Sequence, residues 1–258
     1  MDILDHNRRA WDAEVESGSA YTIPVSVAQI AAARRGKWLL FLTATRPIPR
    51  PWFPSLRDCE VLCLAGGGGQ QGPILAAAGA RVTVYDLSPR QLARDRFVAE
   101  RDGLELVTVE GDMADLSAFP DGRFGLIVHP ISNLFAPSVH PVWAEAHRVL
   151  RPGGILISAF MNPARYIFDL ARADNEGVLE VKHSLPFSST DLSEVARDRI
   201  FGADAPLEFS HTLEDQIGGQ LRAGFVLTDF FEDTRPDDLI AKHLPAAFVT
   251  RAIKASHP

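Results

Sequence analysis

From residue 59 onward, short apolar runs alternate with stretches in which apolar and polar residues recur at helical spacing. A short apolar run bounded by turn residues indicates a buried strand, and a period near 3.6 residues indicates an amphipathic helix. The pattern predicts strands at 59–65, 81–85, 104–109, 124–129, 155–160, 225–231 and 248–254. It predicts helices between the earlier strands at 72–79, 89–101 and 141–150.

This order of elements predicts an α/β fold with a doubly wound, mostly parallel sheet of seven strands. Strands that alternate with helices are joined by right-handed crossovers, which place parallel strands side by side. The last two predicted strands are joined by a loop rather than a helix. We therefore expect them to form an antiparallel hairpin at one edge of the sheet.

The segments before and after this alternation are less regular. Before it, we expect helices at 7–16 and 28–35, the second capped by Ser26, a short strand at 37–45, and a stiff connection at 46–54, which holds four prolines. After the fifth strand, we expect a helix at 167–173, a strand at 179–185 and a helix at 211–223. The chain then divides into an N-terminal helical lid at 1–57 and a main domain at 58–258, in which 161–210 is an insertion on the substrate side.

Size and composition exclude several classes of protein. A chain of 258 residues forms one large domain or one domain with an elaborated cap. The net charge of −7 argues against a nucleic-acid partner, which would require a basic face. No signal peptide is visible at the start, and the apolar run at 38–44 is too short to span a bilayer, so we expect no membrane partner. Cys59 and Cys63 both belong to a predicted strand, which favours core packing and a cytoplasmic location.

The strongest chemical signal lies where the first predicted strand ends. A buried strand runs into four glycines and then a helix, in the sequence Val61-Leu-Cys-Leu-Ala-Gly-Gly-Gly-Gly-Gln-Gln-Gly72. Glycine permits a sharp turn and a close approach of the backbone to a ligand. The N-terminus of the following helix offers unpaired N–H groups to an anionic group.

An acid, Asp86, ends the second predicted strand seventeen residues after Gly69. In open α/β sheets an acid at this place accepts hydrogen bonds from ribose hydroxyls. Taken alone, Asp86 would also suit the cap of the next helix. The spacing Gly67-x-Gly-x-x-Gly72 matches the dinucleotide fingerprint as well, so a nicotinamide or flavin enzyme stays open at this point.

Three later motifs bear on the choice. In Glu110-Gly-Asp-Met113, the carboxylate can accept from the exocyclic amine of an adenine and the methionine can lie against the ring. Asp121-Gly-Arg-Phe-Gly-Leu-Ile-Val-His-Pro130 ends the fourth strand in polar residues at the switch point, where ligands bind in open α/β sheets. Glu145-Ala-His-Arg-Val-Leu-Arg-Pro-Gly-Gly-Ile-Leu-Ile157 predicts a helix, a tight turn and the fifth strand.

With these motifs in this order, residues 58–160 resemble the class I S-adenosylmethionine-dependent methyltransferases of the small-molecule type, and are similar to the ubiquinone- and menaquinone-biosynthesis-like group. The matching motifs are the glycine turn, Asp86-Leu-Ser-Pro89, Gly111-Asp-Met113, Phe124-Gly-Leu-Ile127 and Arg148-Val-Leu-Arg-Pro-Gly-Gly154. The resemblance implies a Rossmann-like fold and the transfer of a methyl group from S-adenosylmethionine to a small-molecule acceptor.

The resemblance also implies the residues of the cofactor site. Ala65, Gly66, Gly67 and Gly69 would hold the methionine part, Asp86 the ribose, Leu87, Gly111, Asp112 and Met113 the adenine, and His129 would lie near the sulfonium. Two positions depart from the family pattern, since Cys63 stands where an acid is usual and Ala65 where a glycine is usual. The missing acid removes a partner of the cofactor's amino end, and the alanine methyl narrows the turn.

Methyl transfer from a sulfonium is a direct displacement, so the protein mainly aligns the reacting atoms and excludes water. If the acceptor must lose a proton, His129 is the best candidate base, because an ordinary histidine has a pKa of about 6.5. His129 would alternatively cap the strand or orient the substrate. Asn133 is a candidate ligand of the substrate or of the cofactor carboxylate, and Trp11, Tyr21 and Tyr166 are candidate walls of the acceptor pocket.

Other functions stay open on the residues alone. None of Tyr21, Tyr85 and Tyr166 is followed four residues later by lysine, so the Tyr/Lys pair of short-chain reductases is absent. Non-methylating chemistry on the same scaffold, as in a cyclase or lyase, and a non-catalytic cofactor-binding protein are the remaining alternatives. We expect no bound metal, because no HExxH or paired CxxC motif occurs. The sequence leaves open the acceptor, the atom that is methylated and the oligomeric state.

Overall fold

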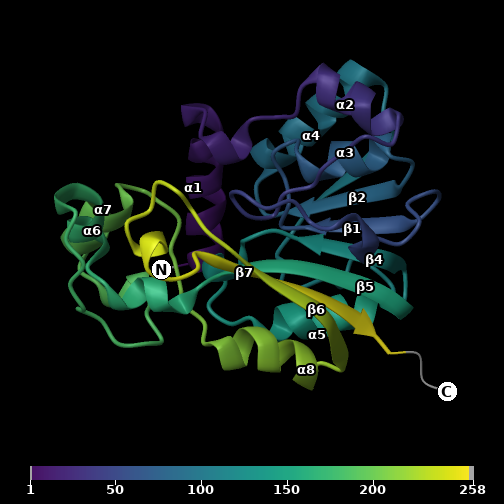
Figure 1. Cartoon of the computed structure of the whole chain (residues 1–258). Coiled ribbons are helices and arrows are strands. Elements are labelled where there is room, and N and C mark those ends of the chain that lie inside the picture. Colours follow the sequence, from purple (N-terminus) through teal and green to yellow (C-terminus); the bar gives the residue numbers. More distant parts are fainter. Residues whose placement is uncertain (1, 256–258) are drawn as a thin grey trace.

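A seven-stranded sheet forms the centre of the computed structural model, which describes residues 2–255 (Figure 1). The strands are β1 (Glu60–Leu64), β2 (Arg81–Asp86), β3 (Leu106–Glu110), β4 (Phe124–His129), β5 (Leu150–Met161), β6 (Phe225–Asp233) and β7 (Ala247–Lys254). Their order across the sheet is β3-β2-β1-β4-β5-β7-β6. Strands β1 to β5 are parallel, whereas β7 runs antiparallel to both β5 and β6. This arrangement confirms the predicted doubly wound α/β fold and its antiparallel C-terminal edge.

Helices cover both faces of the sheet. They are α1 (Ile3–Ser17), α2 (Val27–Arg34), α3 (Gln71–Ala77), α4 (Pro89–Asp102), α5 (His140–Val149), α6 (Leu170–Glu176), α7 (Glu194–Phe201) and α8 (Gly219–Arg222). Successive side chains of a strand point to opposite faces. Val61 and Cys63 of β1 therefore pack in the core shared with α2, α3 and α4. Leu62 and Leu64 pack in the core on the other face, which α5 covers.

The N-terminal helix α1 joins two parts of the molecule that are distant in sequence. Figure 1 shows α1 between the helices that cover the sheet and the unit that holds α6 and α7. On the sheet side, Asp12 accepts a hydrogen bond of 2.6 Å from Ser88 at the cap of α4. On the other side, Asn7 is buried and its side-chain oxygen accepts a hydrogen bond of 2.7 Å from the backbone N–H of Leu207.

Two predicted strands do not form. At 37–45 the side chains do alternate, with Leu40 and Leu42 buried in the sheet core and Phe41 exposed, but the backbone forms only an isolated bridge between Phe41 and Pro47. At 179–185 there is a single bridge to Val181, whose side chain is 68% exposed. A strand with no buried face lacks the cross-strand contacts that stabilise a sheet.

Outside the sheet, two predicted helices need correction and one helix was missed. The helix predicted at 167–173 begins at Leu170, after Asp169 as its N-cap. The helix predicted at 211–223 is shorter and consists of a π-turn at Glu214–Gly218 followed by α8. Helix α7 was not predicted, since it buries no residue and so has no apolar stripe.

Within residues 2–255, no helix combines the length and the apolar character that crossing a membrane requires. Cys59 and Cys63 are buried and form no disulfide. Burial raises the pKa of the Cys63 thiol far above its usual range, so this cysteine packs as an uncharged side chain.

Candidate active site

A cavity of about 640 Å³ lies at the carboxyl ends of the parallel strands. In an open α/β sheet this is where ligands bind, at the point where the strand order reverses. Ten of the fourteen predicted site residues line the cavity: Trp11, Tyr21, Ala65, Gly66, Gly67, Asp86, Leu87, Gly111, Asp112 and Met113. The cavity therefore brings the lid, the glycine turn and the predicted adenine and ribose residues together.

The glycine turn begins with an unusual backbone. Ala65 has a φ of 47°, in the left-handed region that residues with a side chain rarely adopt. Its N–H donates to the carbonyl of Tyr85 at 2.7 Å, which holds the turn against β2. At Gly67 a Cβ atom would lie 2.7 Å from the Cβ of Gln91, so only glycine allows the loop to pass there. The motif is thus needed for the path of the backbone itself.

Asp86 is fixed at the end of β2 by backbone groups. Its Oδ2 accepts from the N–H of Gly67 at 2.9 Å, and its Oδ1 accepts from the N–H of Ser88 at 3.0 Å. Burial raises the pKa of Asp86, and the backbone hydrogen bonds oppose this rise. A carboxylate has about four acceptor sites. Asp86 therefore keeps capacity for hydroxyl donors in the cavity that it lines.

Asp95 of α4 is a supporting residue that no sequence motif singled out. Its Oδ2 accepts from the N–H groups of Gly68 and Gly69 at 3.0 and 3.1 Å, while its Oδ1 has no partner among the described residues. The side chain is fully buried, and burial raises its pKa to about 8. An acid thus supports the turn from α4, although β1 carries Cys63 at the position where the family pattern has an acid. The available signal was a charge at helical spacing between the apolar Leu92 and Val98.

Tyr85 of β2 supports the loop that carries Asp112 and Met113. A Cβ atom on Gly111 would fall 1.9 Å from the hydroxyl of Tyr85, so glycine is required for this close approach. That hydroxyl donates to the carbonyl of Asp115 at 2.7 Å. Asp112 accepts from the N–H of Ala114 at 3.0 Å, which turns the loop back toward α5.

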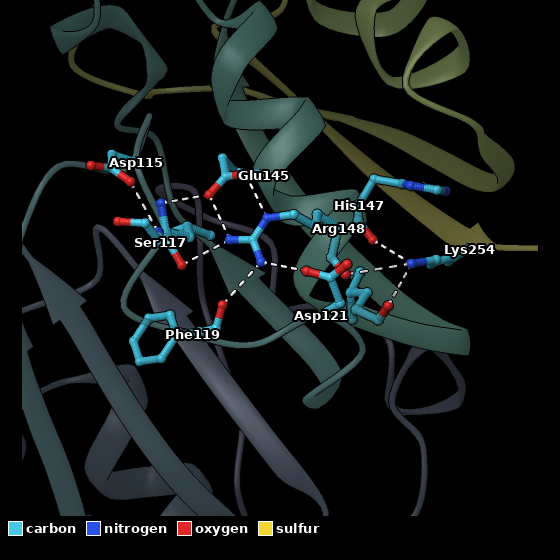
Figure 2. A network of polar contacts seen from close by, with 10 residues as sticks. Asp115, Ser117, Phe119, Asp121, Glu145, His147, Arg148 and Lys254 are labelled. Atoms are coloured by element: carbon cyan, nitrogen blue, oxygen red, sulfur yellow. Dashed lines mark hydrogen bonds and ion pairs between the residues drawn. The ribbon is translucent and has the colours of Figure 1, made fainter.

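Arg148 of α5 clamps the rest of this loop (Figure 2). Its guanidinium donates to both carboxylate oxygens of Glu145 at 2.7 Å and to Asp121 at 2.7 Å. It also donates to the carbonyls of Leu116 and Phe119, both at 2.9 Å. Charge-assisted, bidentate hydrogen bonds of this kind are strong and directional. The motif around Arg148 therefore fixes residues 116–121, which follow the cavity-lining residues 111–114.

The lid is tied directly to the glycine turn. The side-chain amide of Gln70 donates to the carbonyls of Tyr21 and Ile23 at 3.3 and 3.1 Å, and the N–H of Val25 donates to the carbonyl of Gly69 at 2.9 Å. Tyr21 lies at the rim, with 59% of its surface exposed. Trp11 packs edge-on against Phe135 at a ring distance of 5.1 Å. The N-terminal segment and the glycine turn are consequently connected by hydrogen bonds.

The remaining four predicted site residues, Gly69, His129, Asn133 and Tyr166, do not line the cavity. His129, which the resemblance places near the sulfonium, has a fully buried ring that lies edge-on to Trp143 of α5. Its Nδ1 lies 2.9 Å from the carbonyl oxygen of Leu64, and its Nε2 lies 2.7 Å from the amide oxygen of Asn133. Burial lowers the pKa of His129, which favours the neutral ring. His129 is thus placed to join β4 to the following loop.

Tyr166 does not reach the cavity itself but contacts Glu208, a residue that the sequence did not indicate. It is 1% exposed, and its hydroxyl donates to Glu208 at 2.7 Å. Glu208 lines the cavity, together with the ion pair of Arg165 and Asp238. Because Glu208 and Tyr166 are 42 residues apart and neither belongs to a motif, only the fold brings them together.

Comparisons with known proteins agree with this geometry. Residues 62–158 match a family model described as "Methyltransferase domain". The "Uncharacterized methyltransferase YbaJ" of Bacillus subtilis is 47% identical over 98% of each chain. The chain belongs to the class I S-adenosylmethionine-dependent methyltransferase family. S-adenosylmethionine is the cofactor of this family.

Solved structures of methyltransferases have the same fold. An S-adenosylmethionine-dependent methyltransferase from Mesorhizobium loti superposes with a TM-score of 0.63 at 19% identity, covering 79% of this chain and 94% of the other. The 1,6-didemethyltoxoflavin-N1-methyltransferase of Burkholderia thailandensis gives a TM-score of 0.56 at 17% identity, over 98% and 88% of the two chains. The narrower assignment to the ubiquinone- and menaquinone-like group stays a prediction.

Proposed function

We propose that this methyltransferase acts on a small molecule enclosed in the cavity, by direct displacement. One observation carries the proposal: a single cavity runs from Gly67 and Asp86 at the glycine turn to Met161, Arg165 and Glu208 beside the insertion. Cavities of roughly 300–1,000 Å³ enclose drug-sized ligands. A volume of about 640 Å³ fits a cofactor and a small acceptor far better than a macromolecular substrate.

The residues of the cavity fit the cofactor. The turn at 65–69 leaves a cradle that a Cβ at Gly67 would close, and Asp86 keeps free acceptor sites beside it. We infer that Ala65, Gly66 and Gly67 hold the methionine part, that Asp86 holds the ribose, and that the residues beside the adenine are Leu87, Gly111, Asp112 and Met113. S-adenosylmethionine supplies an activated methyl group on a sulfonium centre.

The chain itself then aligns the acceptor and keeps water out. Helix α1 bridges two distant parts of the chain through its hydrogen bonds to Ser88 and Leu207. Residues 134–138 also line the cavity. A separate apolar cluster around Tyr166, Leu170, Phe187 and Ile240 supports our view of 161–210 as a substrate-side insertion. Holding the reacting groups in line supplies much of the rate in such displacements.

The same proposal covers location and partners. Two free, buried cysteines support a cytoplasmic location, and the net charge of −7 supports a partner other than nucleic acid. Trp11 and Tyr21 line the cavity and are proposed as acceptor walls. Tyr166 and Asn133 lie behind the wall, so any contribution of theirs to acceptor binding passes through their neighbours.

The test is a product search by mass. The protein is incubated with S-adenosylmethionine carrying a deuterated methyl group, first with a metabolite pool that passes a small-molecule filter and then with the retained macromolecules. We expect S-adenosylhomocysteine to form only with the small-molecule pool, together with a product that carries the labelled methyl group. Label found only in macromolecules would contradict the small-molecule acceptor. A new product without the label would favour cyclase or lyase chemistry.

A further inference from the structure

Charged side chains gather at the insertion end of the cavity, away from the residues assigned to the cofactor. The charged residues that line this end are Arg165, Asp174, Glu208, Arg235 and Asp238. Arg165 and Asp238 form an ion pair in which the two side chains are 19% and 9% exposed. A pair this close is neutral as a unit, so the charge that a ligand meets comes from the other three residues.

Glu208 is the member of this group that is partly buried and has no ion-pair partner in the described part of the chain. No Lys, Arg or His within residues 2–255 forms an ion pair with it. Its only side-chain hydrogen bond among the described residues comes from the hydroxyl of Tyr166, to Oε2 at 2.7 Å. Asp174 and Arg235 are exposed, so they lie where water screens them.

Both the backbone and the carboxylate of Glu208 have defined hydrogen-bond partners. Its backbone N–H donates to the hydroxyl of Ser189 at 2.9 Å, and its carbonyl accepts from the N–H of Ser189 at 2.8 Å. Tyr166 is stacked on Phe187 at a ring distance of 5.3 Å, which fixes the hydroxyl that meets the carboxylate. A site this well supported is preorganised for a ligand.

The carboxylate of Glu208 has hydrogen-bond acceptor sites that no described residue fills. Burial raises the pKa of Glu208, against the hydrogen bond from Tyr166 and the more distant charge of Arg165. A buried carboxylate is costly unless donors or a cation satisfy it, and one hydroxyl uses only part of its acceptor capacity. Groups perturbed in this way and facing a cavity are typical of binding sites. The missing partner is a hydrogen-bond donor with positive charge.

We propose that Glu208 binds the methyl acceptor through a nitrogen that bears a proton, so that the acceptor is an amine or a basic nitrogen heterocycle. This inference rests on the proposed function, since it assigns the insertion end of the cavity to the acceptor. Tyr166 is a positioning residue that aims the carboxylate. An acceptor that carries a carboxylate at this place would be repelled by Glu208, and the unpaired Arg235 is exposed, so water screens most of the attraction that it would offer.

The test uses three simple probes on the protein saturated with S-adenosylhomocysteine: benzylamine, benzyl alcohol and benzoate. Binding is followed by ligand-observed NMR. We expect benzylamine to bind about tenfold more tightly than the other two, which corresponds to roughly 1.4 kcal/mol. Glu208→Gln, which keeps the size and removes the charge, should abolish this preference. Glu232→Gln, a matched change on the exposed surface of β6, should leave it intact.

Affinity for S-adenosylhomocysteine, measured on the same samples, separates the two proposals. If Glu208→Gln keeps that affinity and loses benzylamine, the inference stands. Preferred binding of benzoate, equal benzylamine affinity in the wild type and Glu208→Gln, or no binding of any probe would overturn it while the methyltransferase proposal stands. Failure of the wild type to bind S-adenosylhomocysteine would instead refute the proposed function. Tyr166→Phe supplies a second readout, since it should weaken benzylamine binding without changing the affinity for S-adenosylhomocysteine.

Discussion

At the scale of single residues, two acids hold the glycine turn from opposite sides. Asp86 accepts from the N–H of Gly67, and Asp95 accepts from the N–H groups of Gly68 and Gly69. Asp86 lines the cavity, whereas Asp95 is enclosed in the core. The first is therefore free to meet a ligand, and the second can only shape the loop that meets it.

Asp95 makes the stability of the protein depend on pH. Burial raises the pKa of Asp95 to about 8 in the folded chain, whereas an unfolded aspartate has a pKa of about 3.9. As pH rises, the unfolded state releases its proton first, so the stabilising contribution is complete below about pH 4 and is lost as pH passes about 8. Asp95→Asn keeps an oxygen for both N–H groups and removes the titration. We expect thermal unfolding to show a falling Tm for the wild type over this range and a flatter profile for Asp95→Asn.

Two outcomes check this account of Asp95. Asp95→Ala removes both acceptors and should lower the free energy of unfolding by about 2 kcal/mol near pH 4, and this difference should shrink as pH rises toward 8, because the variant lacks the titrating carboxyl. It should also weaken binding of S-adenosylhomocysteine, because the turn loses its support. Identical pH profiles for the wild type and Asp95→Asn would show that the carboxyl of Asp95 does not titrate in this range.

A substitution at Ala65 is expected to stabilise the protein, whereas Asp95→Ala is expected to destabilise it. The φ of 47° at Ala65 costs a residue with a side chain roughly 1–2 kcal/mol, and glycine avoids this cost. We expect Ala65→Gly to raise the free energy of unfolding by about 1 kcal/mol in urea denaturation. Ala93→Gly, at an exposed position inside α4, is the matched control and should lower it by about 1 kcal/mol. A loss of stability in Ala65→Gly would count against strain at this turn.

At the scale of elements, the central strands β1 and β4 were predictable because they are buried on both faces. Val61, Leu62, Cys63 and Leu64 are all fully buried, and such strands appear in a sequence as continuous apolar runs. The segment at 37–45 is also largely apolar, but its buried side chains pack against the sheet core while its backbone joins no sheet. Its apolar character alone therefore led to a wrong prediction. Helix α7 has no buried side chain, so no periodic signal existed for it.

The clamp of Arg148 is an interaction between elements that can be tested directly. Three hydrogen bonds join it to Leu116, Phe119 and Asp121 of the neighbouring loop, and two more to Glu145 stay within α5 (Figure 2). We expect Arg148→Met to lower the free energy of unfolding by about 2–3 kcal/mol and to weaken S-adenosylhomocysteine binding through Asp112 and Met113. Urea denaturation and titration calorimetry measure the two effects.

Arg57→Met is the matched control for this clamp, since Arg57 is exposed at the surface. It should change the free energy of unfolding by less than about 0.5 kcal/mol. An Arg148→Met protein as stable as this control would mean that the loop at 111–123 does not depend on the clamp.

At the scale of the whole molecule, most residues predicted for the cofactor line the cavity, whereas of the four predicted for the acceptor only Trp11 and Tyr21 do. The glycine turn, Asp86 and Asp112 are local motifs at strand ends, so the sequence places them. Glu208 meets Tyr166, and Asn7 meets Leu207, only through contacts between distant segments. The side to which His129 points depends on packing against Trp143, which the polar ending of β4 did not reveal.

The central claim is that this fold binds S-adenosylmethionine with Asp86 on its ribose, and one measurement tests it most directly. S-adenosylhomocysteine is titrated by calorimetry into the wild type and into Asp86→Ala, with circular dichroism showing that both are folded. We expect one molecule to bind per wild-type chain, and at least about tenfold weaker binding to Asp86→Ala. No binding to the wild type, or equal affinity for both proteins, would contradict the account.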